Sequence, residues 1–148
     1  MAPQLSFSND VFSSFAFYGT VVVVKMLLMS FLTVKQRISK GVFANQEDVT
    51  KKGMKPIMND PDVERVRRNH LNDLENIPAF LLLGFLYVLT GPSTFMALLH
   101  FRIFAASRII HTIAYQVPLP QPSRALAFLA GLAINLSMAV QILMVAKW

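Results

Sequence analysis

The sequence contains no cysteine among its 148 residues. Disulfide bonds, cysteine-ligated metal sites and a nucleophilic cysteine of the protein's own are therefore excluded. Any thiol chemistry performed by this chain must use the sulfur atom of a bound ligand. The remaining residues predict no metal site.

Charged residues are also scarce. They make up 15% of the chain, against about 25% in a typical soluble domain. They cluster between long apolar runs, and 54% of all residues are hydrophobic. This pattern is typical of a multi-pass membrane protein. The formal net charge of +6 does not indicate nucleic acid binding, because no basic helix stands apart from the apolar runs.

Four apolar runs predict four transmembrane helices, at about 11–36, 62–89, 93–116 and 124–146. Each is long enough to cross a bilayer core of about 30 Å at about 1.5 Å per residue. A polar loop at about 37–61 and turns around Gly91-Pro92 and Pro118–Pro122 separate them. We therefore predict an all-α, integral membrane four-helix bundle that forms a single domain, residues 1–148.

Basic residues are absent from the N-terminal tail and from the second loop, but they are frequent in the first loop, where Lys51 and Lys52 are examples. The positive-inside rule therefore places the first and third loops in the cytosol and both termini on the opposite side. The tail also lacks the basic region of a signal peptide, so we interpret the first apolar run as a retained helix. We expect the endoplasmic reticulum membrane, with the mitochondrial outer membrane as the alternative.

The second predicted helix must carry polar residues into the bilayer. Its purely apolar part, 77–89, would span only about 20 Å, so part of the segment 70–76 must lie at membrane depth. Ionisable groups are costly there unless they face the bundle interior. Four polar residues share one helix face through the spacing i, i+3, i+7 and i+10: Arg65, Arg68, Asn72 and Glu75. We expect this face to point inward.

The other helices bring polar residues to the same level. Arg108, His111 and Tyr115 are spaced i, i+3 and i+7, in the cytosolic half of the third helix. Arg37 ends the first helix, and Arg124 begins the fourth. This predicts a site for a polar ligand between the helices.

The charge of this predicted site is mostly positive, with Glu75 or Asp73 as carboxylates. Arginines bind carboxylates in bidentate fashion, and a carboxylate accepts an amine. Glutathione, with two carboxylates, one amine and one thiol, has the matching groups.

Each residue alone also has an ordinary explanation. Arginines such as Arg37 and Arg65 near helix ends are common interfacial anchors, Tyr115 fits an aromatic belt, and His111 fits a satisfied interior histidine. The aligned polar stripes on two helices favour a ligand site, because buried polar groups need partners.

Lys25 interrupts the first apolar run at a depth similar to that of Asp73 and Glu75. We expect it to form an ion pair with one of these carboxylates inside the bundle. His100 and Arg102 fall in the opposite half of their helix, far from the predicted site. We expect structural roles for both.

Several segments resemble the signature of the membrane-associated proteins in eicosanoid and glutathione metabolism: Val63–Asn76, Phe43-Ala44-Asn45 followed by Glu47-Asp48, Arg108–Tyr115 and Pro120–Leu126. The resemblance covers nearly the whole chain. It implies a homotrimer of four-helix subunits, with glutathione bound between neighbouring subunits near the cytosolic face.

The resemblance implies, position by position, a set of residues that contact glutathione: Arg37, Arg68, Asn72, Glu75, His111, Tyr115 and Arg124. It places Arg124 nearest the sulfur, which makes Arg124 the expected catalytic residue. Arg108 joins the expected binding residues because it begins the polar stripe of the third helix.

Three positions separate the branches of this family. The prostaglandin E synthase branch has serine, arginine and tyrosine where this chain has Ala125, Leu71 and Phe128. These differences favour a glutathione transferase that conjugates glutathione to lipophilic electrophiles arriving through the bilayer, with reduction of lipid hydroperoxides as a second activity. Two alternatives stay open: a glutathione-dependent isomerase of the prostaglandin E synthase type, and a non-catalytic membrane scaffold or transporter.

Overall fold

The computed structural model describes residues 5–49 and 55–147, and all regular elements within these ranges are helical. They are α1 (Asp10–Lys40), the short 3-10 helix η1 (Gln46–Asp48), α2 (Pro61–Leu89), α3 (Thr94–Gln116) and α4 (Ser123–Val145). The four α-helices are long and apolar enough to cross a membrane. The predicted all-α fold with four such helices is confirmed.

The first helix is longer than the sequence predicted. The Asn9 side chain caps its start by accepting hydrogen bonds from two backbone N–H groups at 3.0 and 3.2 Å. Its end lies at Lys40, followed by Gly41 with a φ of 62°, a left-handed conformation that favours glycine. Arg37 therefore lies in the last turn of α1 instead of ending it, and the polar connection is shorter than the predicted 37–61.

The connection between α1 and α2 is held by charged side chains. Lys40 forms ion pairs with Asp60, at 3.4 Å, and with Asp62. The Asp60 carboxylate also caps α2, accepting from the backbone N–H groups of Asp62 and Val63 at 3.0 and 3.1 Å. Lys51 and Lys52, two of the basic residues used to orient the chain, lie outside the described residues.

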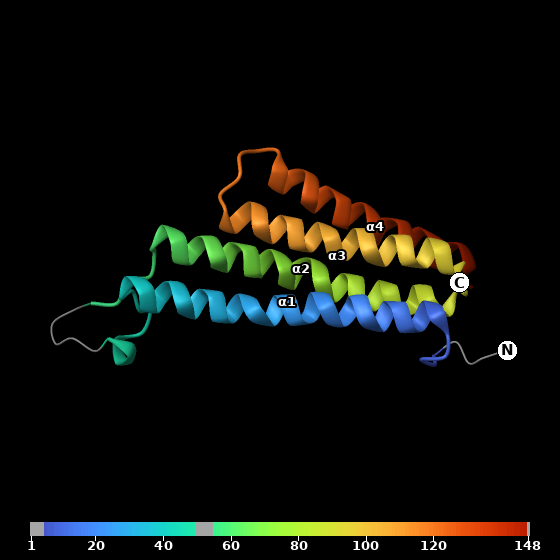
Figure 1. Ribbon diagram of the computed structural model, residues 1–148, viewed down its shortest axis with the longest axis horizontal. Helices are drawn as coiled ribbons and strands as arrows, with labels where there is room; N and C mark the ends of the chain where they lie inside the picture. Colours follow the sequence, from blue (N-terminus) through green and yellow to red (C-terminus); the bar gives the residue numbers. More distant parts are fainter. Residues whose placement is uncertain (1–4, 50–54, 148) are drawn as a thin grey trace.

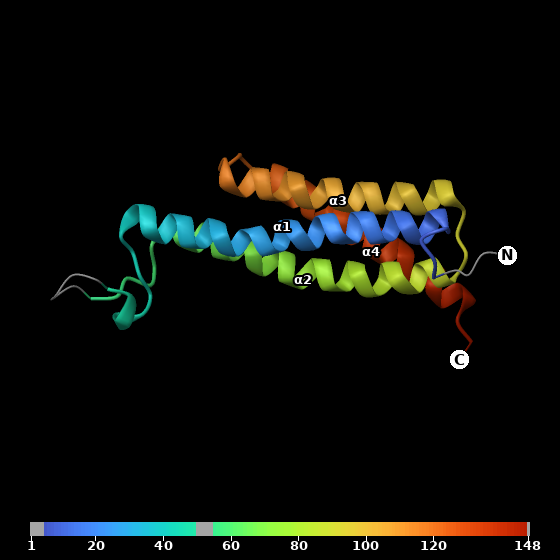
Figure 2. The same ribbon diagram turned by 60° about the horizontal axis from the view of Figure 1, so that its bottom comes forward.

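The four helices run side by side in up-and-down order (Figures 1 and 2). α1 packs against α2 and α3, α4 packs against the same two helices, and α2 also contacts α3. The start of α1 and the end of α4 lie at one end of the bundle, while the α1–α2 and α3–α4 connections lie at the other, here named the connection end (Figure 1). This arrangement is the up-and-down topology that the loop pattern predicted.

At the connection end, α1 and α2 project beyond α3 and α4 (Figure 1). α1 has 31 residues and α3 has 23, which correspond to about 46 and 34 Å of helix. A bilayer core is about 30 Å thick. The last turns of α1 and the first turns of α2 are thus not needed to cross the membrane.

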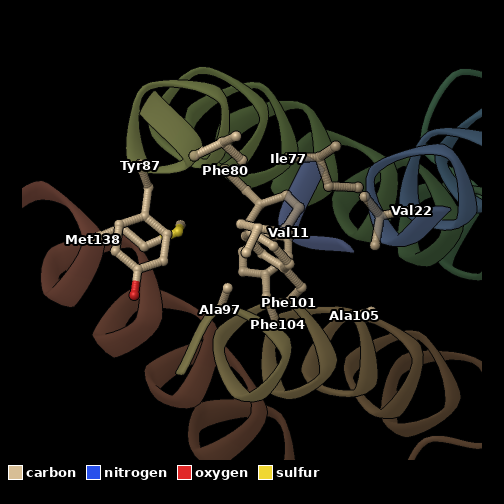
Figure 3. Packing of buried hydrophobic residues seen from close by; sticks show 11 residues of the cluster. Val11, Val22, Ile77, Phe80, Tyr87, Ala97, Phe101, Phe104, Ala105 and Met138 are labelled. Carbon is tan, nitrogen blue, oxygen red and sulfur yellow. The ribbon is translucent and has the colours of Figure 1, made fainter. Parts of the chain in front are cut away.

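Aromatic rings fill the centre of the bundle. The rings of Phe80 in α2 and Phe104 in α3 are stacked, with centroids 3.9 Å apart, and Phe101 lies edge-on to Phe80 at 6.1 Å. Figure 3 shows these rings between α2 and α3, with Tyr87 directed towards Met138 of α4. In a bilayer such close packing holds helices together, because lipid offers no hydrophobic driving force between them.

His100 and Arg102 each link two helices in the half of α3 away from the connection end. His100 Nε2 lies 2.9 Å from Ser137 Oγ of α4. Arg102 Nε donates to Tyr18 Oη of α1 at 3.0 Å. These contacts agree with the structural roles expected from the sequence.

Candidate functional site

Arg108 lies at the centre of a polar cluster between α2, α3 and α4. Its side chain is fully buried. Nη1 donates to Asn72 Oδ1 at 2.9 Å, and Nη2 donates to the Ala127 carbonyl at 3.3 Å. The guanidinium carbon also lies 5.8 Å from the centroid of the Phe104 ring. One arginine of α3 therefore holds a side chain of α2 and the backbone of α4.

Helix α1 reaches this cluster through Lys25, which forms an ion pair with Asp73. Asp73 is completely buried, and the Lys25 side chain is 13% exposed. The predicted ion pair inside the bundle is confirmed, and Asp73, not Glu75, is the partner. Asp73 is also close enough to Arg108 for mutual electrostatic attraction, although Arg108 forms no direct ion pair within the described part of the chain.

Towards the connection end the cluster continues through His111 and Tyr115, whose ring centroids are 5.0 Å apart. The guanidinium carbon of Arg124 lies 5.0 Å from the centroid of the Tyr115 ring, within the range of a cation–π contact. His111 lies close enough to Arg108 and Arg124 for electrostatic interaction with both. With Asn72, five of the eight predicted site residues are therefore brought together by one chain.

Arg124 occupies the second position of α4. The N-terminus of a helix carries a partial positive charge from its aligned peptide dipoles. Arg124 therefore adds its own charge to that of the helix end, and this part of the cluster is suited to stabilise an anion.

Several buried side-chain polar atoms in this cluster have no hydrogen-bond partner within residues 5–49 and 55–147. They include Arg108 Nε, His111 Nδ1 and Arg124 Nε, together with Thr112 Oγ1 and Gln116 Nε2. Buried polar atoms normally have partners, so these atoms fit a surface that binds a polar ligand. The sequence interpretation missed Thr112 and Gln116, although the spacing of 108, 112 and 116 places them on one helix face.

The other three predicted residues do not join the cluster within one chain. Arg68 and Glu75 are exposed, and neither has a hydrogen bond or ion pair within residues 5–49 and 55–147. Arg37 lies in the last turn of α1, where its Nη1 atom is buried and has no partner among the residues that the structure describes. An open groove of about 290 Å³ on the outer face of α2 is lined in part by Arg68 and Leu71.

The expectation that the Arg65–Glu75 face of α2 points inward is therefore wrong for a single chain. The polar residues that α2 directs into the bundle are Asn69, Asp73 and Asn76. They extend the stripe of buried apolar residues at three- and four-residue spacing, and Asn72 lies at its edge. Packing of this apolar stripe fixes the rotation of the helix, and Arg68 and Glu75 are carried to the outside.

The side chains of the cluster are mainly cationic and neutral hydrogen-bond donors, which suits a ligand with carboxylate groups. Among the described residues, no group of three or more His, Asp or Glu side chains is placed to bind a metal ion.

Comparison with known protein families gives a match over residues 15–144, which includes every predicted site residue, to the MAPEG family. The chain belongs to the MAPEG family. The resemblance deduced from the sequence motifs is confirmed.

Two groups of MAPEG proteins resemble the chain to different degrees. Microsomal glutathione S-transferase 1 from pig is 52% identical over 140 residues, covering 91% of this chain and 90% of the relative. The human protein of that name is 51% identical over the same shares. Human prostaglandin E synthase is 39% identical over 143 residues, covering 96% and 94%. The transferases are the more similar group, as Ala125, Leu71 and Phe128 predicted.

Gly131 of α4 allows Arg108 to lie against that helix. A Cβ atom at this position would lie 2.9 Å from Ser107 Oγ and 3.2 Å from Arg108 Nη2. We expect Gly131→Ala to displace the guanidinium from the Ala127 carbonyl and to destabilise the bundle by about 1–3 kcal/mol, as is usual for overpacking. Thermal unfolding of the purified protein in detergent measures this loss.

Gly19→Ala is the matched control for this substitution. Its Cβ atom would lie 3.2 Å from Leu81 Cδ2, the end of a flexible side chain that is able to move. Alanine also favours helix over glycine by up to about 1 kcal/mol, so this variant should melt at or above the wild-type temperature. Equal destabilisation by both variants would contradict the role assigned to Gly131.

Proposed function

We propose that this MAPEG protein is an enzyme, a glutathione transferase that joins the glutathione sulfur to lipophilic electrophiles. One observation carries the proposal: relatives named microsomal glutathione S-transferase 1 are 51–54% identical to it over 91% of its length. The polar cluster supports it, because it contains cations and buried polar atoms that have no partner among the described residues. The helices that carry the cluster are long and apolar enough to cross a membrane.

Glutathione is the proposed co-substrate, and eight residues are proposed to act on it. The binding residues are Arg37, Arg68, Asn72, Glu75, Arg108, His111 and Tyr115, and Arg124 is the catalytic residue. Guanidinium groups would bind the two carboxylates, and Glu75 would accept the amine. Thr112 and Gln116 offer further polar atoms on the same face of α3.

Arg124 is proposed to stabilise the glutathione thiolate. A free thiol has a pKa of about 8.5, so most of it is protonated at neutral pH. Lowering that pKa by about two units requires roughly 2.7 kcal/mol of preferential stabilisation of the anion. A guanidinium group in a partly desolvated position, assisted by the N-terminus of α4, is able to supply this amount.

The thiolate then attacks the electrophilic carbon of the second substrate. A carbon–sulfur bond forms, the bond to the leaving group breaks, and the leaving group departs with the electron pair. The thiol proton is released to solvent before the attack. Because the second substrate is apolar and the helices border lipid, we propose that it enters from the bilayer.

Reduction of lipid hydroperoxides is proposed as a second activity of the same thiolate. Attack on the peroxide oxygen breaks the oxygen–oxygen bond and gives glutathione sulfenic acid and an alkoxide, which takes a proton from solvent and becomes an alcohol. A second glutathione converts the sulfenic acid to glutathione disulfide and water.

We further propose that the chain forms a homotrimer in the endoplasmic reticulum or mitochondrial outer membrane. The exposed Glu75 supports an assembly, because it lies in the part of α2 expected at membrane depth, where a charged group is costly when it faces lipid. In a trimer, α2 of one chain would face a neighbouring copy, and Arg68 and Glu75 would complete a site shared between subunits.

A conjugation assay tests the proposed function. Purified protein in detergent is mixed with glutathione and 1-chloro-2,4-dinitrobenzene, and the conjugate and the thiolate are followed by absorbance. Saturable turnover that consumes glutathione is the expected result. A thiolate signal without consumption of glutathione, in the presence of an isomerisable peroxide, would favour the isomerase. Absence of both thiolate and turnover would contradict an enzyme and leave a membrane scaffold.

A further inference from the structure

Lys25 is set apart from the proposed glutathione-binding residues. Within the described residues, its hydrogen bonds and ion pairs join it only to Asp73. Asp73 is next in sequence to Asn72, whose side-chain oxygen accepts a hydrogen bond from Arg108 at 2.9 Å. Lys25 of α1 is thus linked to Arg108 of α3 through two adjacent residues of α2. Arg108 is one of the residues proposed to bind glutathione.

The linked residues include two cations, Lys25 and Arg108, and one carboxylate, Asp73. All three are buried or nearly so, and their formal charges sum to about +1 at neutral pH. Asp73 Oδ2 pairs with Lys25, whereas its Oδ1 atom is buried without a partner in the described part of the chain. Arg108 directs its two terminal nitrogens to Asn72 and to the Ala127 carbonyl.

We propose that Lys25 is a positioning residue for glutathione binding. Lys25 pairs with the Asp73 carboxylate and so leaves Arg108 to hold Asn72 in place. Without Lys25, Asp73 would be a buried anion whose remaining basic neighbours are Arg108 and, on its own helix, His70. Of these two, only Arg108 has a permanently charged side chain. An uncompensated buried charge is strongly unfavourable, so the guanidinium would turn to the carboxylate and release Asn72 Oδ1. The inference rests on the proposed transferase function and adds to it a residue that does not touch the ligand.

Lys25→Met is the first variant in the test, studied as full-length protein purified in detergent. We expect the KM for glutathione to rise about tenfold, the effect of losing one hydrogen bond from a charged donor. We expect kcat at saturating glutathione to stay within about threefold, because Arg124 is untouched. Lys25→Arg should return the KM towards the wild-type value. Lys35→Met, an exposed lysine of the same helix, should leave the KM unchanged.

The double variant Lys25→Met/Asp73→Asn tests whether the free Asp73 carboxylate is what diverts Arg108. It removes the carboxylate that would divert Arg108, and its formal charge equals that of the wild type. We therefore expect its KM for glutathione to be lower than that of Lys25→Met and within about threefold of the wild type. If Lys25→Met alone does not fold, a folded double variant still tests the inference, because a KM at least tenfold above that of the wild type would overturn it.

Two results would overturn the inference while leaving the transferase intact. One is a Lys25→Met protein that melts earlier but binds glutathione with the wild-type KM, which would make Lys25 purely structural. The other is a folded double variant whose KM stays at least tenfold above wild type. Failure of the wild-type protein to turn over glutathione would instead overturn the proposed function, and the role of Lys25 with it.

Discussion

Replacing Arg124 with leucine is expected to reduce the absorbance of the glutathione thiolate to background and to lower kcat by at least about 100-fold. The size follows from the usual effect of removing one preorganised group that stabilises a developing anion. Arg124 combines its own charge with the N-terminal dipole of α4, and its guanidinium is held 5.0 Å from the Tyr115 ring. The affinity for glutathione should fall less than tenfold, because the carboxylates have other proposed partners.

The measurement is thiolate absorbance on adding glutathione, together with kcat for 1-chloro-2,4-dinitrobenzene. Arg67→Leu is the matched control, since Arg67 is exposed and pairs with Glu64 on the surface of α2. It should retain both the thiolate signal and turnover. Survival of the thiolate signal in Arg124→Leu would show that another group stabilises the sulfur, and the catalytic role of Arg124 would be wrong.

The number, order and approximate ends of the helices follow from the sequence, because long apolar runs have few alternatives in a bilayer. The end of α1 shows where this reasoning fails. Apolarity ends near residue 36, and the prediction ended the helix there. Backbone hydrogen bonding continues to Lys40, where Gly41 provides the left-handed conformation that closes a helix. A capping residue, not the loss of apolar side chains, sets this boundary.

The polar face of α3 was predictable because its stripe coincides with the inward face of the helix. Arg108, His111 and Ala114 are all buried, so polar and apolar periodicity agree. On α2 the two periodicities disagree. The charged stripe lies beside the apolar one, and the apolar stripe determines the rotation of the helix. Val63 and Val66 mark the inward face, and extending their spacing towards Ile77 would have found Asn69 and Asp73.

The partners of Arg68 and Glu75 could not be derived in the same way. Helical periodicity shows that two residues share a face, but it does not show whether that face meets its own bundle or another copy of the chain. Both residues are exposed on the single chain. Their proposed contact with glutathione therefore rests on the family resemblance and on the proposed trimer.

Replacing Asp73 with alanine is expected to have the largest effect on stability. Asp73 is the buried carboxylate that pairs with Lys25 and attracts Arg108. Without it, two cations would remain inside the bundle with no carboxylate beside them. Breaking a buried ion pair in this way usually costs about 3–5 kcal/mol. We expect a large fall in the thermal midpoint and in the yield of monodisperse protein in detergent.

Glu64→Ala is the control for this variant, because it removes an acidic residue of the same helix from a surface ion pair. Glu64 contacts Arg67 at 2.7 Å, and exposed pairs of this kind contribute about 0–1 kcal/mol. Its thermal midpoint should therefore stay near that of the wild type. If Asp73→Ala melted as late as Glu64→Ala, Lys25 and Arg108 would be stable in the bundle without a carboxylate. The diversion of Arg108 that underlies the role of Lys25 would then lose its physical cause.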